Sequence, residues 1–229
     1  MLSFIVIIIL SYLLGSIPSS VWVGKLYKGI DIREHGSGNA GATNTFRMLG
    51  WKAGVIVAII DLTKGFVAAY YISQLGYHFG DLPAQIGVWH TDIFMRIVAG
   101  LFAVVGHMFP LYANFKGGKG VITAAGMLYG IEPLSISIVL VIFIIVLISS
   151  RYVSLASIVA SFCYPIVVLL MKYQFGYHID GSHIIFASAV ALGIIIKHLP
   201  NIRRLLHGNE NRIRSFKPAK GRLNKEQTT

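Results

Sequence analysis

Three short polar segments, set between long apolar stretches, carry most of the residues that could do chemistry. They span residues 36–47, 116–120 and 198–204. The first two are rich in glycine, and all three carry hydroxyl, amide or cationic side chains. Loops of this composition expose backbone N–H groups beside positive charge, an arrangement that binds phosphate groups. The sequence therefore predicts a phosphate-binding site assembled from three separate segments.

The apolar stretches that must position these segments are typical of an integral membrane protein. The chain is 55% hydrophobic and 13% charged, whereas soluble domains are about 25% charged. A helix needs about 20 apolar residues to cross a bilayer core of about 30 Å. Six stretches come close to that length, and a seventh is shorter and contains glycines. The six are residues 2–24, 53–75, 93–112, 134–150, 152–172 and 183–200, and the short one is residues 119–132.

The distribution of lysine and arginine indicates whether the short stretch crosses the membrane. If it does, and if the N-terminus lies outside, 17 of the 20 basic side chains fall on the cytoplasmic side. With six crossings, Arg151 and the basic residues near the C-terminus would lie on the opposite side. We therefore predict an all-α integral membrane protein with seven transmembrane helices, N-terminus outside, C-terminus cytoplasmic and one short span. Residues 1–208 would form this membrane catalytic domain, and residues 209–229 a mobile basic cytoplasmic tail.

The same residues exclude several other classes of function. The net charge of +11 could indicate nucleic-acid binding, but the basic residues lie beside apolar spans, where they fit membrane topology and anionic lipid. No basic face with aromatic stacking residues lies off the membrane, so nucleic acid is not expected as a partner. The single cysteine, Cys163, allows no intramolecular disulfide. No histidine or cysteine spacing typical of a metal site occurs, so neither a metal nor another cofactor is predicted.

Two apparent nucleotide motifs lack the context that such motifs need. Residues 36–41 match the pattern G-x-G-x-x-G, but no β-strand precedes them, and Asp61, twenty residues beyond Gly41, lies inside a predicted span. Residues 116–120 lack the spacing of a Walker A loop. Asp61 and Lys64 are three residues apart in one span, which favours a structural ion pair. His107 is expected to pack near the second polar segment.

Six motifs occur in order along most of the chain. They are Gly15-Ser-Ile-Pro18, Gly36-Ser-Gly-Asn-Ala-Gly-Ala-Thr-Asn44, Asp61-Leu-Thr-Lys-Gly65, Gly106-His-Met-Phe-Pro110, Phe115-Lys-Gly-Gly-Lys-Gly-Val121 and His198-Leu-Pro-Asn-Ile-Arg-Arg-Leu205, followed by Gly208 and Glu210. Each motif alone is weak, but the ordered set closely resembles one family, the bacterial acyl-phosphate:glycerol-3-phosphate acyltransferases. The resemblance implies seven spans in the bacterial inner membrane, with the active site facing the cytoplasm.

The resemblance also implies a reaction and a set of site residues. A fatty acyl group would pass from acyl phosphate to the 1-hydroxyl of glycerol 3-phosphate, giving 1-acylglycerol 3-phosphate (lysophosphatidate) and phosphate, the first step of phospholipid synthesis. Ser37, Arg47 and Lys119 would bind glycerol 3-phosphate, while His198 and Asn201 would contact the reacting hydroxyl or the donor. Asn39, Thr43, Gly117 and Gly118 would hold acyl phosphate, and Glu210 would brace the third segment. The remaining substrate-binding positions are Gly38, Gly41, Asn44, Lys116 and Gly120.

The residues fit this chemistry independently of the resemblance. Acyl phosphate is an activated mixed anhydride, so positioning and charge neutralisation matter more than a strong nucleophile. The proton of the attacking hydroxyl can go to His198 or to a phosphate oxygen of the substrate, and the scarcity of carboxylates near the segments favours the phosphate. The acyl chain needs an apolar groove between helices, beside membrane lipids. Whether the enzyme that makes acyl phosphate is a direct partner is left open.

Two alternative functions fit part of the pattern. A membrane transporter or flippase for a phosphorylated metabolite could use the same anion-binding loops without any chemistry. A phosphatidyl-transfer enzyme with a CDP-linked donor would need clustered aspartates that hold a divalent metal, and the sequence has no such cluster. Formation of lysophosphatidate by the purified protein would distinguish the enzyme from the transporter.

Overall fold

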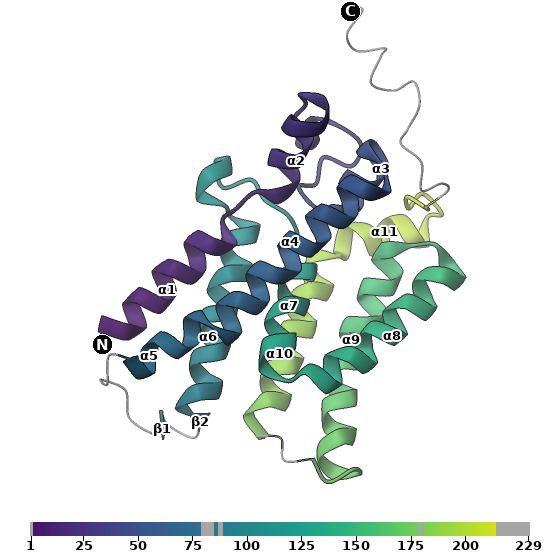
Figure 1. Cartoon of the computed structure of the whole chain (residues 1–229). Coiled ribbons are helices and arrows are strands. Elements are labelled where there is room, and N and C mark those ends of the chain that lie inside the picture. The colour runs from purple at the N-terminus through teal and green to yellow at the C-terminus, as the bar shows by residue number, and fades with distance from the viewer. Residues whose placement is uncertain (1, 79–84, 87–88, 178, 180, 214–229) are drawn as a thin grey trace, which may run out of the picture.

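The chain folds into a bundle of helices, with the short helices α2, α3 and α11 at the end opposite two short strands (Figure 1). A computed structural model describes residues 2–78, 85–86, 89–177, 179 and 181–213. The predicted all-α class is confirmed, apart from an antiparallel pair of two-residue strands, β1 (Gln85–Ile86) and β2 (Trp89–His90). The helices are α1 (Leu2–Gly15), α2 (Ser19–Lys28), α3 (Ala42–Leu49), α4 (Trp51–Tyr70), α5 (Leu75–His78), α6 (Thr91–Met108), α7 (Val121–Ile131), α8 (Pro133–Ser150), α9 (Val153–Tyr173), α10 (Gly181–Lys197) and α11 (Leu199–Leu206).

Long apolar segments make this an integral membrane fold. Within the described ranges, five helical segments are long and apolar enough to cross a bilayer, or six if the bent pair α10–α11 counts as one crossing. Their outward faces stay apolar: on α8, Ile145 is 61% and Ile148 72% exposed. Large apolar side chains in such a continuous exposed face are suited to lipid. The five segments are Leu2–Lys28, Trp51–Tyr77, Thr91–Ala113, Pro133–Ser150 and Val153–Tyr173.

Two of the predicted spans are interrupted. The first, predicted as one helix over residues 2–24, is instead α1 and α2, separated at residues 16–18. Pro18 lacks the N–H group that a continuous helix would need at this position. A Cβ on Gly15 would collide with the backbone of Ala103, so the chain here is also packed closely against α6. The last, predicted over residues 183–200, ends at Lys197, and α11 is bent from α10 by 57°. Pro200 explains this break, because its ring is incompatible with a continuing helix.

The short predicted span is α7, which is packed closely against α4. Its 11 residues rise about 16 Å, well short of a bilayer core. A Cβ on Gly65 would meet the backbone oxygen of Thr123, and one on Gly126 would meet the backbone oxygen of Leu62. The glycines therefore let the two backbones touch, which buries α7 inside the protein, where a short helix is shielded from lipid.

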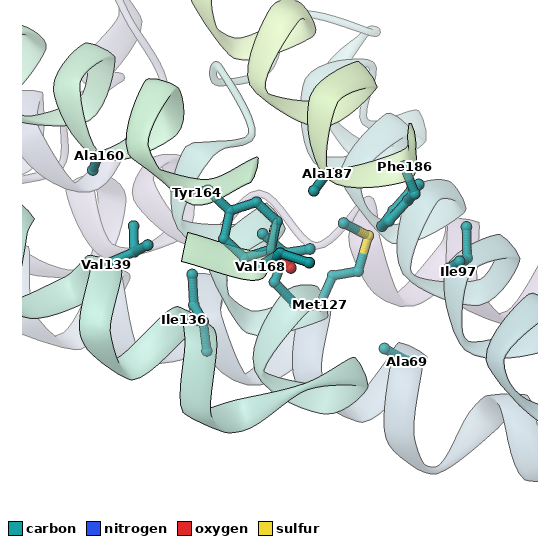
Figure 2. Packing of buried hydrophobic residues seen from close by; sticks show 11 residues of the cluster. Ala69, Ile97, Met127, Ile136, Val139, Ala160, Tyr164, Val168, Phe186 and Ala187 are labelled. Atoms are coloured by element: carbon teal, nitrogen blue, oxygen red, sulfur yellow. The ribbon is translucent and has the colours of Figure 1, made fainter. Parts of the chain in front are cut away.

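A buried apolar cluster joins the second half of the bundle to α7. Figure 2 shows Tyr164 and Val168 of α9 in the middle of this cluster, between Met127 of α7, Ile136 of α8 and Phe186 of α10. Since side chains from four helices interdigitate here, the cluster fixes how α8, α9 and α10 stand against the rest of the bundle. It also closes the inner end of the cavity described next.

Candidate functional site

Residues from all three polar segments line one large cavity of about 1680 Å³. Residues from the first segment, from the start of α7 and from the α10–α11 bend face the same space. Twelve of the predicted site residues line it, and these are Ser37, Gly38, Asn39, Gly41, Thr43, Asn44, Arg47, Lys119, Gly120, His198, Asn201 and Glu210. Segments that are far apart in sequence therefore meet at one end of the bundle, as the sequence predicted.

The N-terminal ends of four helices point into this polar end of the cavity. The residue before each helix lines the cavity: Gly41 for α3, Gly120 for α7, Tyr152 for α9 and His198 for α11. At none of these four described ends does the side chain of that residue cap the helix with a hydrogen bond. The first turn and the positive dipole end of each of these helices therefore lie beside the cavity, where they favour an anion.

Charged side chains at this end are mostly positive. Among the residues that the structure describes, two carboxylates line the cavity, Asp61 and Glu210, and Asp61 is paired with a lysine outside it. The basic side chains that line the cavity are Arg47, Lys119, Arg151, Arg204 and Arg212. The surplus of positive charge, together with the helix ends, gives this end of the cavity the chemistry that suits phosphate groups.

A network of hydrogen bonds ties the start of α7 to α9 and α11. Asn201 accepts a hydrogen bond from Lys119 Nζ through its Oδ1 and donates to Glu210 Oε1 at 2.9 Å. Glu210 also accepts from Ser154 Oγ at 3.1 Å and from Arg204 Nε at 2.7 Å. Because both the oxygen and the NH2 group of the Asn201 amide are hydrogen-bonded, the orientation of the amide is fixed. Asn201 in turn fixes the position of the Lys119 ammonium at the cavity.

The environment changes the acidity of two members of this network. Burial lowers the pKa of Lys119, repulsion from Arg204 lowers it further, and Glu210 offsets this in part. Burial raises the pKa of Glu210, but hydrogen bonds from Asn201, Arg204 and Ser154 together outweigh it, so the pKa lies below its usual value. Burial and the nearby Arg204 destabilise the charged form of Lys119, and a bound anion would stabilise that charged form.

His198 is held in one tautomer at the bend between α10 and α11. Its side chain is buried, and Nδ1 lies 2.8 Å from the backbone oxygen of Ile194. Since a carbonyl oxygen only accepts, Nδ1 carries the proton and Nε2 is left as an acceptor. His198 lies at the break itself, as the residue directly before α11, and Asn201 belongs to the first turn of α11.

Away from its polar end, the cavity is apolar. It continues between α4, α7, α8, α9 and α10, past side chains such as Leu128, Ile136 and Phe143. On one side the lining residues Ile59 and Leu140 are 59% and 51% exposed, so the cavity opens laterally between α4 and α8, where lipid would lie. A molecule with a phosphate head and a long apolar chain matches both parts of this space.

Comparison with known proteins agrees with this geometry. Residues 5–208 match the family model described as glycerol-3-phosphate acyltransferase. A glycerol-3-phosphate acyltransferase of Salinibacter ruber is 46% identical, covering 97% of this chain and 98% of its own, and one of Chlorobium phaeobacteroides is also 46% identical, covering 93% and 98%. The chain belongs to the glycerol-3-phosphate acyltransferase family.

Solved structures of the family share the fold. Two crystal structures of PlsY, an integral membrane glycerol 3-phosphate acyltransferase, superpose with a TM-score of 0.74. The glycerol 3-phosphate form is 35% identical and covers 92% of this chain and 96% of its own. The lysophosphatidic acid form is 36% identical and covers 92% and 95%.

Some of the site residues that the family resemblance implies do not line the cavity. Lys116, Gly117 and Gly118 line a separate small recess instead. Gly118 donates its N–H to the backbone oxygen of His107 at 3.1 Å, so this amide is already hydrogen-bonded within the protein. A Cβ on Gly118 would also collide with the His107 ring. Gly117 and Gly118 therefore allow close packing against His107. The expectation that His107 packs near the second segment is confirmed.

Asn44 likewise holds the first loop together. Its Nδ2 donates to the backbone oxygens of Ile32 and His35, both at 2.9 Å, and its Oδ1 accepts from the Ser37 N–H at 3.0 Å. The side chain is 1% exposed. Although Asn44 lines the cavity, its amide is committed to three backbone groups, so it shapes the loop around Ser37 and is not a free substrate ligand.

The structural ion pair predicted within α4 is present and belongs to a larger group. Asp61 Oδ1 lies 3.0 Å from Lys64 Nζ, 2.7 Å from the Ser19 hydroxyl that donates to it, and 3.4 Å from His107 Nδ1. Lys64 Nζ also donates to the backbone oxygen of Ile17 at 3.0 Å. We call Ser19, Asp61, Lys64 and His107 the scaffold cluster. It joins α4 to α6 and to the break between α1 and α2.

Several residues of the site were missed by sequence reasoning. Residues 208–213 line the cavity, and Ile213 donates its N–H to the backbone oxygen of Arg151 at 2.9 Å. The predicted boundary after residue 208 therefore cuts through the site, and what remains of the predicted tail, residues 214–229, lies outside the described residues. Arg33, which precedes the first segment, donates to the backbone oxygens of Ala113 and Lys116, at 2.8 and 3.3 Å. It thereby holds the chain before the first segment against the start of the second. From sequence, Arg33 and Arg151 stand out only as two of the 17 basic residues expected on the cytoplasmic side.

Proposed function

We propose that this protein transfers a fatty acyl group from acyl phosphate to the 1-hydroxyl of glycerol 3-phosphate, releasing lysophosphatidate and inorganic phosphate. Family membership supports acyl transfer to glycerol 3-phosphate, and acyl phosphate as the donor is our inference. The observation that carries it is the single cavity whose cationic end, with four helix N-termini, continues into an apolar groove. Two phosphate groups need such an end, and a long acyl chain needs such a groove.

The residues at the cationic end divide between the two substrates. Arg47 and Lys119, with the loop around Ser37, bind the phosphate of glycerol 3-phosphate, since a guanidinium and an ammonium can neutralise it together. Asn39 and Thr43, at the start of α3, hold the phosphate of the donor. Asn201 and Glu210 act by fixing the position of Lys119. We assign Lys116, Gly117 and Gly118 a supporting part, in which they set the path of the chain that leads to Lys119 and Gly120.

Because acyl phosphate is already activated, the transfer needs no covalent intermediate with the protein. The glycerol hydroxyl oxygen attacks the acyl carbon, the bond from that carbon to the phosphate oxygen breaks, and phosphate leaves. We propose that a phosphate oxygen of the donor takes the hydroxyl proton and that His198 Nε2 orients the hydroxyl by accepting its hydrogen bond. His198→Gln, which can still accept a hydrogen bond, should then keep measurable turnover. Complete loss in a folded variant would instead identify His198 as the general base.

The reaction is tested with purified protein in detergent. Palmitoyl phosphate and glycerol 3-phosphate should give lysophosphatidate and phosphate in equal amounts, and palmitoyl coenzyme A should not replace the donor. Absence of lysophosphatidate, with uptake of glycerol 3-phosphate into vesicles that contain the protein, would favour the transporter. Product formed only from the coenzyme A ester would contradict the proposed donor.

We also propose seven crossings of the bacterial cell membrane, with α7 as the short one, the N-terminus outside and the site facing the cytoplasm. The distribution of basic residues supports this orientation. In a variant with Cys163 replaced by alanine, a cysteine at Gln85 should react with an impermeant reagent in intact spheroplasts. A cysteine at Lys28 should react only after the membrane is opened. The reverse pattern would overturn this topology.

A further inference from the structure

The apolar groove ends against a buried tyrosine. Tyr164 of α9 lines the cavity and is 2% exposed, whereas its neighbours Met127, Val168 and Phe186 in the buried cluster do not line it. Figure 2 shows the Tyr164 ring with Val168 and Met127 directly against it. The space therefore stops at this ring, and tightly packed side chains lie beyond it.

The face of α9 that borders the groove changes from small to large side chains. Ser154, at the polar end, donates to Glu210, and Ser157, Ala160 and Ser161 follow along the same face before Tyr164. The small side chains leave room along roughly 15 Å of helix between residues 154 and 164. Tyr164 is the first large side chain that a chain lying along this face would meet.

The ring is held by a polar partner inside the apolar cluster. Tyr164 Oη lies 2.8 Å from Nε2 of His183, which is 3% exposed. A hydrogen-bonded pair at this depth is costly to bury, and it fixes the ring more firmly than apolar contacts would. The groove thus ends on a side chain with a defined orientation.

We propose that Tyr164 sets the length of the acyl chain that the enzyme accepts, with its ring as the stop at the end of the groove. This inference rests on the proposed function, in which the acyl chain of the donor occupies the apolar part of the cavity. A chain that bends out through the lateral opening beside Ile59 and Leu140 would not meet this stop. The two paths differ in how the preferred chain length responds to substitutions on α9.

The experiment measures kcat/KM of the purified full chain for decanoyl, lauroyl, myristoyl, palmitoyl and stearoyl phosphate. Tyr164→Ala removes the stop, and each further methylene that it admits is favoured about fourfold. Stearoyl and palmitoyl chains differ by two methylenes, so the ratio of kcat/KM for stearoyl phosphate to that for palmitoyl phosphate should rise about fifteenfold over wild type. Ala160→Leu adds bulk one helical turn closer to the polar end, so it should move the optimum toward shorter chains.

Two variants serve as controls. Tyr164→Phe keeps the ring and loses the hydrogen bond to His183, so its optimum should stay at the wild-type length, and a shift as large as that of Tyr164→Ala would overturn the ring as the stop. Phe162→Ala removes an aromatic ring from α9 that is 60% exposed and does not line the cavity. Its chain-length profile should match that of wild type.

The outcomes separate this inference from the proposed function. Failure of the wild-type protein to use any acyl phosphate would overturn the proposed function. Turnover by wild type with an unchanged profile in folded Tyr164→Ala and Ala160→Leu would overturn only the chain-length inference and favour the lateral path. If Tyr164→Ala does not fold, Ala160→Leu alone decides, because it leaves the buried Tyr164–His183 pair in place.

Discussion

Two polar clusters border the same cavity and are built in opposite ways. In the scaffold cluster, one carboxylate, Asp61, is contacted by Lys64, Ser19 and His107, so its charge is balanced inside the protein. The cavity cluster, which we define as Lys119, Asn201, Arg204 and Glu210, has two cations for one carboxylate, and Arg47 adds a further positive charge nearby.

The difference separates a structural role from a binding role. Buried charges that are fully paired stabilise a fold only through that pairing, and removal of one partner is expensive. Charges left in surplus beside a cavity raise the free energy of the empty site, and an anion lowers it. From this balance of charge we propose that the first cluster serves folding and the second serves substrate binding, and the following predictions test that proposal.

The largest effect is expected from Asp61→Asn. It leaves the Lys64 ammonium buried without a counter-charge, which should cost about 3–5 kcal/mol of stability. The midpoint of thermal unfolding in detergent should fall sharply, whichever substrate is present. The double variant Asp61→Asn with Lys64→Met should recover much of the loss, because no unpaired charge remains. A single variant as stable as wild type would contradict the structural role of this cluster.

Arg47→Lys should affect binding and leave stability nearly unchanged. Lysine keeps the charge but loses the two parallel N–H bonds that a guanidinium offers to phosphate. Loss of one charge-assisted hydrogen bond costs about 1.5–3 kcal/mol, or roughly tenfold to a hundredfold in kcat/KM toward glycerol 3-phosphate. Arg203→Lys is the matched control, since Arg203 is exposed and does not line the cavity. Equal kinetics for the two variants would exclude Arg47 from the site.

The pH dependence of glycerol 3-phosphate binding should change in Lys119→Arg. Because the pKa of Lys119 lies below the usual lysine value of 10.5, its ammonium is lost at lower pH than that of a free lysine. The charged form binds phosphate, so KM for glycerol 3-phosphate should rise on the alkaline side, beginning below that value. Arginine stays charged there, and the variant should lack the rise. Initial rates need correction for hydrolysis of the donor without enzyme, and identical profiles would refute the role of Lys119.

The smallest effect is expected from Glu210→Gln, measured as stability against pH. The pKa of Glu210 in the folded protein lies below its usual 4.5, so its contribution is present above that pH and is lost as pH falls through the folded value. The difference in unfolding midpoint between wild type and variant should be constant near neutral pH and shrink in acid. A difference that grows on acidification would reverse the sign of the predicted coupling.

The sequence predicts best what depends on local spacing. The Asp61–Lys64 pair follows from a separation of three residues on one helix, and the convergence of the three polar segments follows from their places at helix ends. The prediction of one helix over residues 2–24 does not include the break before Pro18, because the stretch as a whole is apolar, and the contact of Gly15 with Ala103, which helps to explain the break, is not visible in local sequence. Such close backbone contacts involve partners distant in sequence, which a local pattern does not contain.

Polar groups within loops were the hardest to assign. Asn44 and Gly118 occur in polar segments, where composition alone does not show whether a polar group binds a ligand or a backbone carbonyl. Asn44 donates to the backbone oxygens of Ile32 and His35, and Gly118 donates to that of His107. Residues 209–212 are polar, a composition that predicts a mobile tail, yet hydrogen bonds from Ser154 of α9 and Arg204 of α11 hold Glu210 in the cavity wall.

The docking of residues 208–213 has a consequence for synthesis of the protein in the cell. Chains emerge from the ribosome N-terminus first, at roughly 5–20 residues per second. The glycine-rich loop around Ser37 is made early, whereas Glu210 and Ile213, which close the network against Ser154 and Arg151, are made near the end of the 229-residue chain. A nascent chain can insert its helices one after another while the site stays incomplete, so acyl transfer begins only when translation is nearly finished.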